Sequence, residues 1–273
     1  MTLSPFQELI PEMDLSKNVL PFSVRRVKEA VSTALTEDID WIFFTNFDIS
    51  SLVALERLHL PVRLCTEPGF LILKMVMKIH ENMHGSIMSY ISWHLGNMGL
   101  IPGLDFSVYG AARYAHRLNQ NSTKQGDISL GPFANDGWPS MVIGAGWSES
   151  LGHLHRDASW WLTAESAPNN PKLILLITFL RRARTFRMER YELRQTTKPA
   201  TRTAPTGVRE VPTLIEAVDI DLRSTPPTII GAPLTIPFKG IMRRDPVGQE
   251  RNISLDAAYL GTWALRMAAA NNL

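Results

Sequence analysis

The feature that most constrains the fold of this chain is a nearly continuous apolar run at residues 173–180, Leu-Ile-Leu-Leu-Ile-Thr-Phe-Leu. A run of this length is typical of a strand that is buried on both faces. It is too short for a membrane-spanning helix, which needs about 20 apolar residues. The run therefore predicts the central strand of a covered sheet, and it gives no reason to expect a membrane protein.

The segments around this run predict further strands and helices. Residues 126–132 and 140–146 are short apolar segments that end at glycine or proline, as strands often do. Residues 186–193 alternate apolar and charged side chains, which is typical of a half-exposed strand. Apolar stripes at helical spacing predict two helices, at 78–99 (Met83, Ile87, Ile91 and Leu95) and at 149–162 (Leu151, Leu154, Ala158, Trp161 and Leu162). The sequence thus predicts an α/β fold with a mixed central sheet flanked by helices.

These predicted elements also indicate a domain organisation. The main domain is expected at residues 70–273, where helices and strands follow one another. Residues 1–69 mix proline, charges and short apolar runs without a catalytic motif, so they are expected to be an N-terminal extension packed on that domain. Residues 195–212 are rich in Thr, Pro, Arg and Ala, which is the composition of a loop or a flexible insertion.

Charge and cysteine content narrow the classes of function. The formal net charge is +2, so binding of nucleic acid would need a local basic patch. Cys65 is the only cysteine, so the chain can form neither an intrachain disulfide nor a cysteine-rich zinc site. An intracellular protein, cytoplasmic or nuclear, is therefore expected. The first residues carry acids and a proline where a signal peptide would have an apolar segment, so no signal peptide is expected.

Several short sequence motifs resemble those of a known protein family in their order and spacing. They are Leu73-Lys-Met, His80-Glu-Asn-Met-His84, Lys124-Gln-Gly-Asp127-Ile-Ser, Trp138-Pro-Ser-Met-Val-Ile-Gly-Ala-Gly-Trp-Ser-Glu-Ser-Leu151, Arg156-Asp-Ala-Ser-Trp-Trp-Leu162 and Pro233-Leu-Thr-Ile-Pro-Phe238. Together they resemble a group of fungal proteins with a restriction-endonuclease-like domain of the PD-(D/E)XK nuclease type. The resemblance covers residues 70–265, and its most specific part is 139–162.

The resemblance implies cleavage of phosphodiester bonds in DNA with the help of a metal ion. In that family two or three carboxylates hold Mg²⁺ or Mn²⁺, and the metal activates water and neutralises charge on the phosphate. The family pattern places one acid on the first helix, where this chain has Glu81, and one on a strand, where it has Asp127. These two residues are the expected metal ligands. Folds of this kind often pair, so a homodimer is also considered.

The chain departs from the family pattern on the next strand. Relatives would carry glutamate at the position of Gly144, and the lysine expected two residues later is replaced by Gly146. Lys124 could supply the cation from another strand, and Glu149 is an acid close by, although its place at the start of a predicted helix also suits the helix dipole. Two hypotheses stay open. One is an active nuclease, and the other is a degenerate pseudo-enzyme that keeps the fold as an interaction or nucleic-acid-binding module.

The string His80-Glu81-Asn82-Met83-His84 also satisfies the HExxH pattern of zinc peptidases. In such enzymes the two histidines bind zinc from one helical face, and the glutamate acts as general base. A third ligand would have to come from His94 or His116, and neither stands in a known continuation of the pattern. A zinc metallopeptidase is therefore a third alternative, which the predicted order of strands favours less.

Arginines crowd the segment from residue 181 to residue 194. Guanidinium groups match phosphate oxygens, so this segment could bind nucleic acid in a salt-dependent way. The alternative is a solvated strand whose positive charges prevent edge-to-edge association. The expected contacts to nucleic acid are Arg181, Arg182, Arg184 and Arg187.

Overall fold

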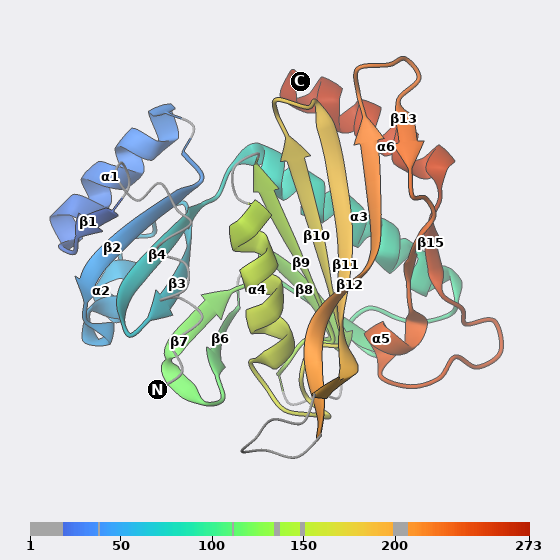
Figure 1. Ribbon diagram of the computed structural model, residues 1–273, viewed down its shortest axis with the longest axis horizontal. Coiled ribbons are helices and arrows are strands. Elements are labelled where there is room, and N and C mark those ends of the chain that lie inside the picture. Colours follow the sequence, from blue (N-terminus) through green and yellow to red (C-terminus); the bar gives the residue numbers. More distant parts are fainter. Residues whose placement is uncertain (1–18, 38, 111, 134–136, 148–150, 199–206) are drawn as a thin grey trace. The chain divides into compact units, whose positions relative to one another are not determined.

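The chain folds into two compact units (Figure 1). A computed structural model describes residues 19–37, 39–110, 112–133, 137–147, 151–198 and 207–273. The first unit takes the described residues within Met1–Met77 and Ala111–Gly126, and the second takes those within Lys78–Gly110 and Asp127–Leu273. Each unit is therefore built from two separate stretches of the sequence.

The first unit is a six-stranded mixed sheet in the order β1-β2-β4-β3-β7-β6. Strand β1 pairs in parallel with β2, and the other neighbours pair antiparallel. Its elements are β1 (Val19–Pro21), α1 (Val24–Glu37), β2 (Trp41–Phe47), a short 3-10 turn (Ile49–Ser51), α2 (Leu52–Glu56), β3 (Val62–Glu67), β4 (Gly69–Met75), β6 (Arg113–His116) and β7 (Asn119–Gln125).

Side-chain alternation separates the two faces of this sheet. In β2, Ile42 and Phe44 belong to the core cluster that also contains Val27 of α1 and Leu55 of α2. Their neighbour Phe43 belongs to a smaller buried cluster with Trp41, Cys65 and Ile72. Because successive side chains of a strand point to opposite faces, both helices cover the same face of the sheet. Cys65 is buried as a free thiol.

The second unit is built on a seven-stranded sheet in the order β13-β12-β11-β10-β9-β8-β5. The apolar run of the sequence is its central strand β10, which pairs in parallel with β9 and antiparallel with β11. The elements are α3 (Lys78–Asn97), β5 (Phe106–Tyr109), β8 (Ile128–Pro132), β9 (Met141–Trp147), α4 (Leu151–Thr163), β10 (Leu173–Leu180), β11 (Thr185–Lys198), β12 (Gly207–Asp221), β13 (Thr228–Ile230), β14 (Leu234–Ile236), α5 (Phe238–Met242), β15 (Ile253–Leu255) and α6 (Ala257–Asn271).

Helices cover both faces of this sheet. In β11, Phe186 contacts Trp263 of α6, and the indole N–H of Trp263 donates to the hydroxyl of Ser86 in α3. Glu189 of the same strand, three positions on, contacts His155 of α4 instead. Residues three apart in a strand point to opposite faces, so α4 covers one face while α3 and α6 cover the other (Figure 1). The predicted α/β fold with a mixed, helix-flanked sheet is thus confirmed.

Two predicted boundaries differ from the structure. Residues 195–198 and 207–212 were expected in a loop, but they belong to β11 and β12, which pair from Thr185↔Asp221 to Lys198↔Gly207. The cross-strand hydrogen bonds of this long hairpin satisfy the backbone that composition alone suggested to be irregular. The predicted domain boundary at residue 69 falls at the first residue of β4, within the first unit.

No helix in the described ranges is both long enough and apolar enough to cross a membrane.

Candidate functional site

Asp127, the expected strand ligand, ties two strands together. It directly precedes β8 and is only 7% exposed. Its Oδ2 accepts a hydrogen bond from the backbone N–H of Ala145 in β9, at 2.8 Å. The ladder between β8 and β9 is paired from Ile128↔Ile143 onward, so this side chain adds one more link beyond the backbone pairs. The carboxylate therefore lies beside β9, and one of its oxygens is engaged in holding the sheet.

Two aliphatic side chains lie close to Gly144, which is itself partly exposed. A Cβ atom on Gly144 would lie 3.2 Å from Cδ2 of Leu176 and 3.7 Å from Cδ2 of Leu154. Leu176 comes from the neighbouring strand β10 and Leu154 from α4, and both are fully buried. The space where a relative would place a carboxylate is therefore part of the apolar packing between α4 and the sheet.

Glu81 and the two histidines of the HExxH string lie on α3 in different surroundings. His80 and His84 are buried, whereas the side chain of Glu81 is 43% exposed. Oε1 of Glu81 lies 3.3 Å from Nε2 of His84. Of the two alternatives for a third zinc ligand, His94 is on the same helix, where its ring packs on Tyr90 and Trp93, and His116 belongs to the first unit.

The remaining predicted site residues are Lys124 and Glu149. Lys124 is a buried residue of β7 in the first unit, whereas Asp127 belongs to the second unit. Glu149 lies outside the described residues. Within the described ranges, no three His, Cys, Asp or Glu side chains are grouped so that they could hold a metal ion.

The predicted arginine cluster divides into two parts. Arg181, Arg182 and Arg184 are exposed in the turn between β10 and β11. The guanidinium of Arg181 lies 5.0 Å from the ring of Trp147, at the end of β9. Arg187, in contrast, points toward the α4 face and is bound to acids of its own sheet. The turn keeps its charges at the surface, while Arg187 has a structural role.

Arg187 is part of a chain of charged groups that the sequence analysis missed. Its Nε donates to Oε1 of Glu189 at 2.8 Å, and its Nη1 donates to both carboxylate oxygens of Asp219 at 2.9 and 2.8 Å. On the other side, Oε2 of Glu189 lies 2.6 Å from Nε2 of His155 in α4. The side chain of His155 is 38% exposed, whereas Glu189 is 2% exposed. A buried carboxylate thus joins α4 to β11 and β12.

The environment of Glu189 favours its ionised form. Burial by itself would raise the pKa of this carboxyl, but the hydrogen bonds and charges of His155 and Arg187 outweigh burial and place its pKa below the usual value. Burial, together with the charge of Glu189, raises the pKa of the neighbouring Tyr191 phenol to about 12. Through Glu189, this chain of groups fixes the position of the His155 ring against the sheet.

Glu189 cannot replace the carboxylate that Gly144 lacks. Gly144 pairs with Leu176, and Leu176 pairs with Glu189, so these three residues form one row on the α4 face. Neighbouring strands lie about 4.8 Å apart, which puts Glu189 roughly 10 Å from Gly144 along the sheet. The acid belongs to the packing of α4 and not to the surroundings of Asp127.

The alternation of residues 186–193 contained a signal for these buried charges. The charged positions were assigned to solvent because one face of a half-exposed strand usually is solvated. Here both faces are covered, and Arg190 on the opposite face is also buried, with ion pairs to Glu192 and Glu216. Charged residues of opposite sign in an interior strand indicate paired ions as well as exposure.

Comparison with models of protein families found no match, and comparison with curated proteins found none.

Proposed function

We propose that the second unit is a restriction-endonuclease-like domain that binds nucleic acid without cleaving it. The order of elements supports this fold, because a helix (α3) precedes strands β5, β8 and β9, and α4 then leads to the parallel strand β10. The resemblance assigns Asp127, directly before β8, and Gly144 in β9 to the positions of two acids of the family.

The observation that carries the non-catalytic part of the proposal is the packing around Gly144. A Cβ there would already lie 3.2 Å from the end of the Leu176 side chain, so a carboxylate would press on this leucine and would lie beside Leu154. Loss of one metal carboxylate leaves the ion misplaced, and misplacement by about 1 Å can already lower a rate by about a hundredfold. The chain would then keep the fold and lose the cleavage step.

The exposed turn of Arg181, Arg182 and Arg184 supports binding of phosphate groups. Guanidinium forks suit phosphate oxygens, and Arg181 is held over the ring of Trp147. The net charge of the chain is small, so this local group of cations would be the main source of attraction. DNA is the partner that the resemblance implies.

A binding assay and a cleavage assay on the full chain test the proposal together. Labelled duplex and single-stranded DNA are incubated with the protein in Mg²⁺ and in Mn²⁺, beside an Asp127→Ala variant. Binding without cleavage supports the proposal. Cleavage that disappears in Asp127→Ala would show an active nuclease, and absence of binding would remove the nucleic-acid role.

A further inference from the structure

One edge strand of the second unit lacks the features that usually keep sheet edges from pairing. Natural edge strands are protected by charges, by proline or by being very short. Among the described strands of the two larger sheets, the edges β1 and β13 have three residues each, and β6 carries Arg113 and His116. Strand β5, which ends the seven-stranded sheet, has the sequence Phe-Ser-Val-Tyr, with neither a charge nor a proline.

The hydrogen bonds around β5 show which of its backbone groups point away from the sheet. The carbonyl of Asp105, just before the strand, accepts the N–H of Phe133, just after β8, so it points inward. The carbonyl of Phe106 accepts the N–H of Gly103 in the preceding loop, so it points outward. Because successive residues alternate in direction, the N–H and C=O of Val108 also point outward. In the described ranges, no further strand lies beyond them.

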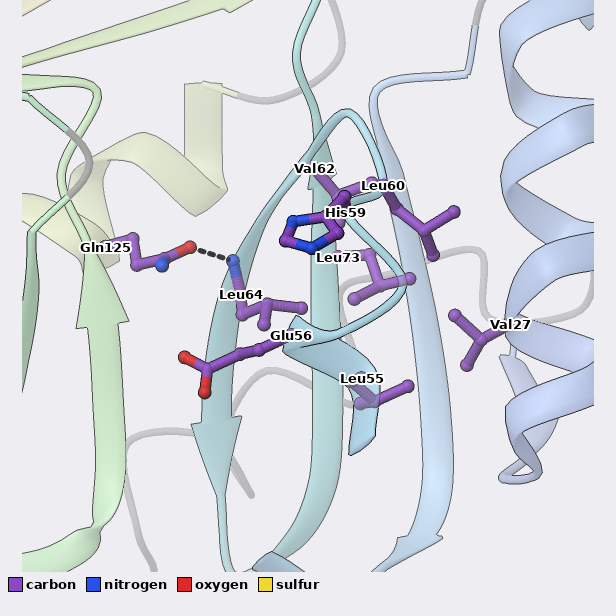
Figure 2. A pocket seen from close by; sticks show the side chains of 9 residues that line it. All are labelled: Val27, Leu55, Glu56, His59, Leu60, Val62, Leu64, Leu73 and Gln125. Carbon is purple, nitrogen blue, oxygen red and sulfur yellow. Dashed lines mark hydrogen bonds between the residues drawn. The ribbon is translucent and has the colours of Figure 1, made fainter. Parts of the chain in front are cut away.

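Elsewhere in the chain, side chains satisfy backbone groups beside short ladders. Next to the ladder between β3 and β7, Oε1 of Gln125 accepts the backbone N–H of Leu64 at 2.8 Å (Figure 2). Beside β8, Oδ2 of Asp127 does the same for the N–H of Ala145. No described side chain accepts the outward N–H of Val108 in this way. This edge is therefore available to a strand from another chain.

Apolar side chains gather near the outward edge. Val108 is exposed, and Ile101, Leu104 and Phe133 are each more than half exposed. The N–H of Leu104 donates to the carbonyl of Ile101, and Phe133 is bonded to Asp105, so these residues lie close together. Side chains exposed to this degree protrude from the surface rather than line a groove. A peptide strand is usually selected by pockets beside the edge, whereas a protruding apolar edge suits a second edge of the same kind.

We propose that two copies of this chain pair antiparallel through β5, about a two-fold axis at Val108. In that arrangement the N–H and C=O of Val108 in each copy bond to the C=O and N–H of Val108 in the other. The same surface serves on both copies, as a closed dimer requires. The apolar side chains near the edge are needed as well, because two hydrogen bonds contribute less than the freedom that two proteins lose on association.

Charge does not oppose this pairing. Asp105 is the charged residue closest to β5 in the sequence, and its Oδ2 accepts the backbone N–H of Ile101. With the axis at Val108, the two Asp105 residues would lie on opposite sides of the axis, about 20 Å apart along the strands. That separation exceeds the Debye length of about 8 Å at physiological salt, so the repulsion between them is screened.

Sedimentation velocity of the full-length protein without DNA tests the proposal. Small interfaces form weak complexes, so the concentration series runs from about 1 to about 200 μM. We expect a reversible change from monomer to dimer without larger species, because the pairing uses the β5 edge of both copies. A protein that stays monomeric at about 200 μM, or that forms larger species, would overturn the proposal. The outcome is independent of the function proposed for the second unit, since no DNA is present.

Three substitutions locate the interface. Val108→Pro removes the outward N–H and leaves the bonds to β8, because proline is tolerated where its nitrogen faces away from the sheet. Both hydrogen bonds across the axis are then lost, so the dimer should weaken at least about tenfold. Leu104→Lys places a charge on an exposed position near the edge and should also weaken the dimer.

The matched control is Ile230→Lys, which places the same charge on an exposed position of β13, at the opposite edge of the sheet. It should leave the dimer unchanged. Circular dichroism shows whether each variant is folded, and Leu104→Lys keeps the test decisive if Val108→Pro is not. A dimer that survives in the folded variants at Val108 and Leu104, or that is lost equally in Ile230→Lys, would overturn the assignment to β5.

Discussion

Oδ2 of Asp127 accepts the backbone N–H of Ala145 at 2.8 Å, so the residue expected to hold a metal closes the ladder between β8 and β9. The neighbouring position, Gly144, faces Leu176 and Leu154. At this place a buried carboxylate supports the sheet. Substitutions at Asp127 and Gly144 should therefore have different consequences for stability and for catalysis.

Asp127→Ala should destabilise the protein. Its carboxylate is buried, and its removal leaves the N–H of Ala145 without that acceptor, which costs about 1–3 kcal/mol. Asp127→Asn keeps an oxygen acceptor and should cost less. Urea unfolding of the three proteins measures the free energies of unfolding. If both variants were as stable as the original protein, the structural role of Asp127 would be wrong.

Gly144→Glu should destabilise the protein through overpacking. Its Cβ would press on Leu176, and overpacked cores lose about 1–3 kcal/mol. Gly144→Ala is the matched control and should cost less, because it adds only the Cβ. Adding Leu176→Ala should make the cost of Gly144→Glu smaller than it is alone, since the two positions are in contact. Thermal unfolding measures this coupling, and strictly additive effects would contradict the packing described.

The ion pairs of Glu189 should make stability depend on pH. Because the folded-state pKa of Glu189 is lowered, its contribution is present above the unfolded value of about 4.3 and is lost as pH falls through the folded pKa. Glu189→Gln should therefore be less stable than the original chain at pH 7, by about 2 kcal/mol. The gap should close below pH 4. Urea unfolding at pH 3 to 7 checks this, and a gap that stays constant would contradict it.

The salt dependence of DNA binding should become weaker when the arginines of the turn between β10 and β11 are removed. Each phosphate contact changes the slope of log K against log salt by about 0.9. Replacing Arg181, Arg182 and Arg184 by alanine should therefore reduce the slope by about 2–3. The control removes three exposed arginines elsewhere in the second unit, Arg209, Arg251 and Arg266. Fluorescence anisotropy over a salt series measures both slopes, and equal losses would remove the turn as the binding surface.

The sequence predicted the second unit better than the first. Period-four stripes located α3 and α4, short apolar runs located β8, β9 and β10, and the alternation located the first part of β11. Residues 113–125 form strands that complete the sheet of residues 19–75. Local patterns carry no information on such distant pairing, so the first unit was interpreted as an extension.

At the candidate site, too, the sequence predicted local features but not the contacts between distant elements. The resemblance singled out Asp127 and Gly144, which the structure places directly before β8 and within the neighbouring strand β9. It could not show that Leu154 and Leu176 fill the space at Gly144, or that Glu189 reaches His155, since those contacts join separate elements. Arg187 was assigned to nucleic acid for this reason, although it binds Glu189 and Asp219.

The most direct test of the central claim is one titration of labelled duplex DNA with the full-length protein in Mg²⁺, in which the same samples are then run on a denaturing gel. The account predicts saturable, salt-sensitive binding that weakens in the variant lacking Arg181, Arg182 and Arg184, with the DNA strands intact. DNA that is cut by the original protein and left whole by Asp127→Ala would contradict it.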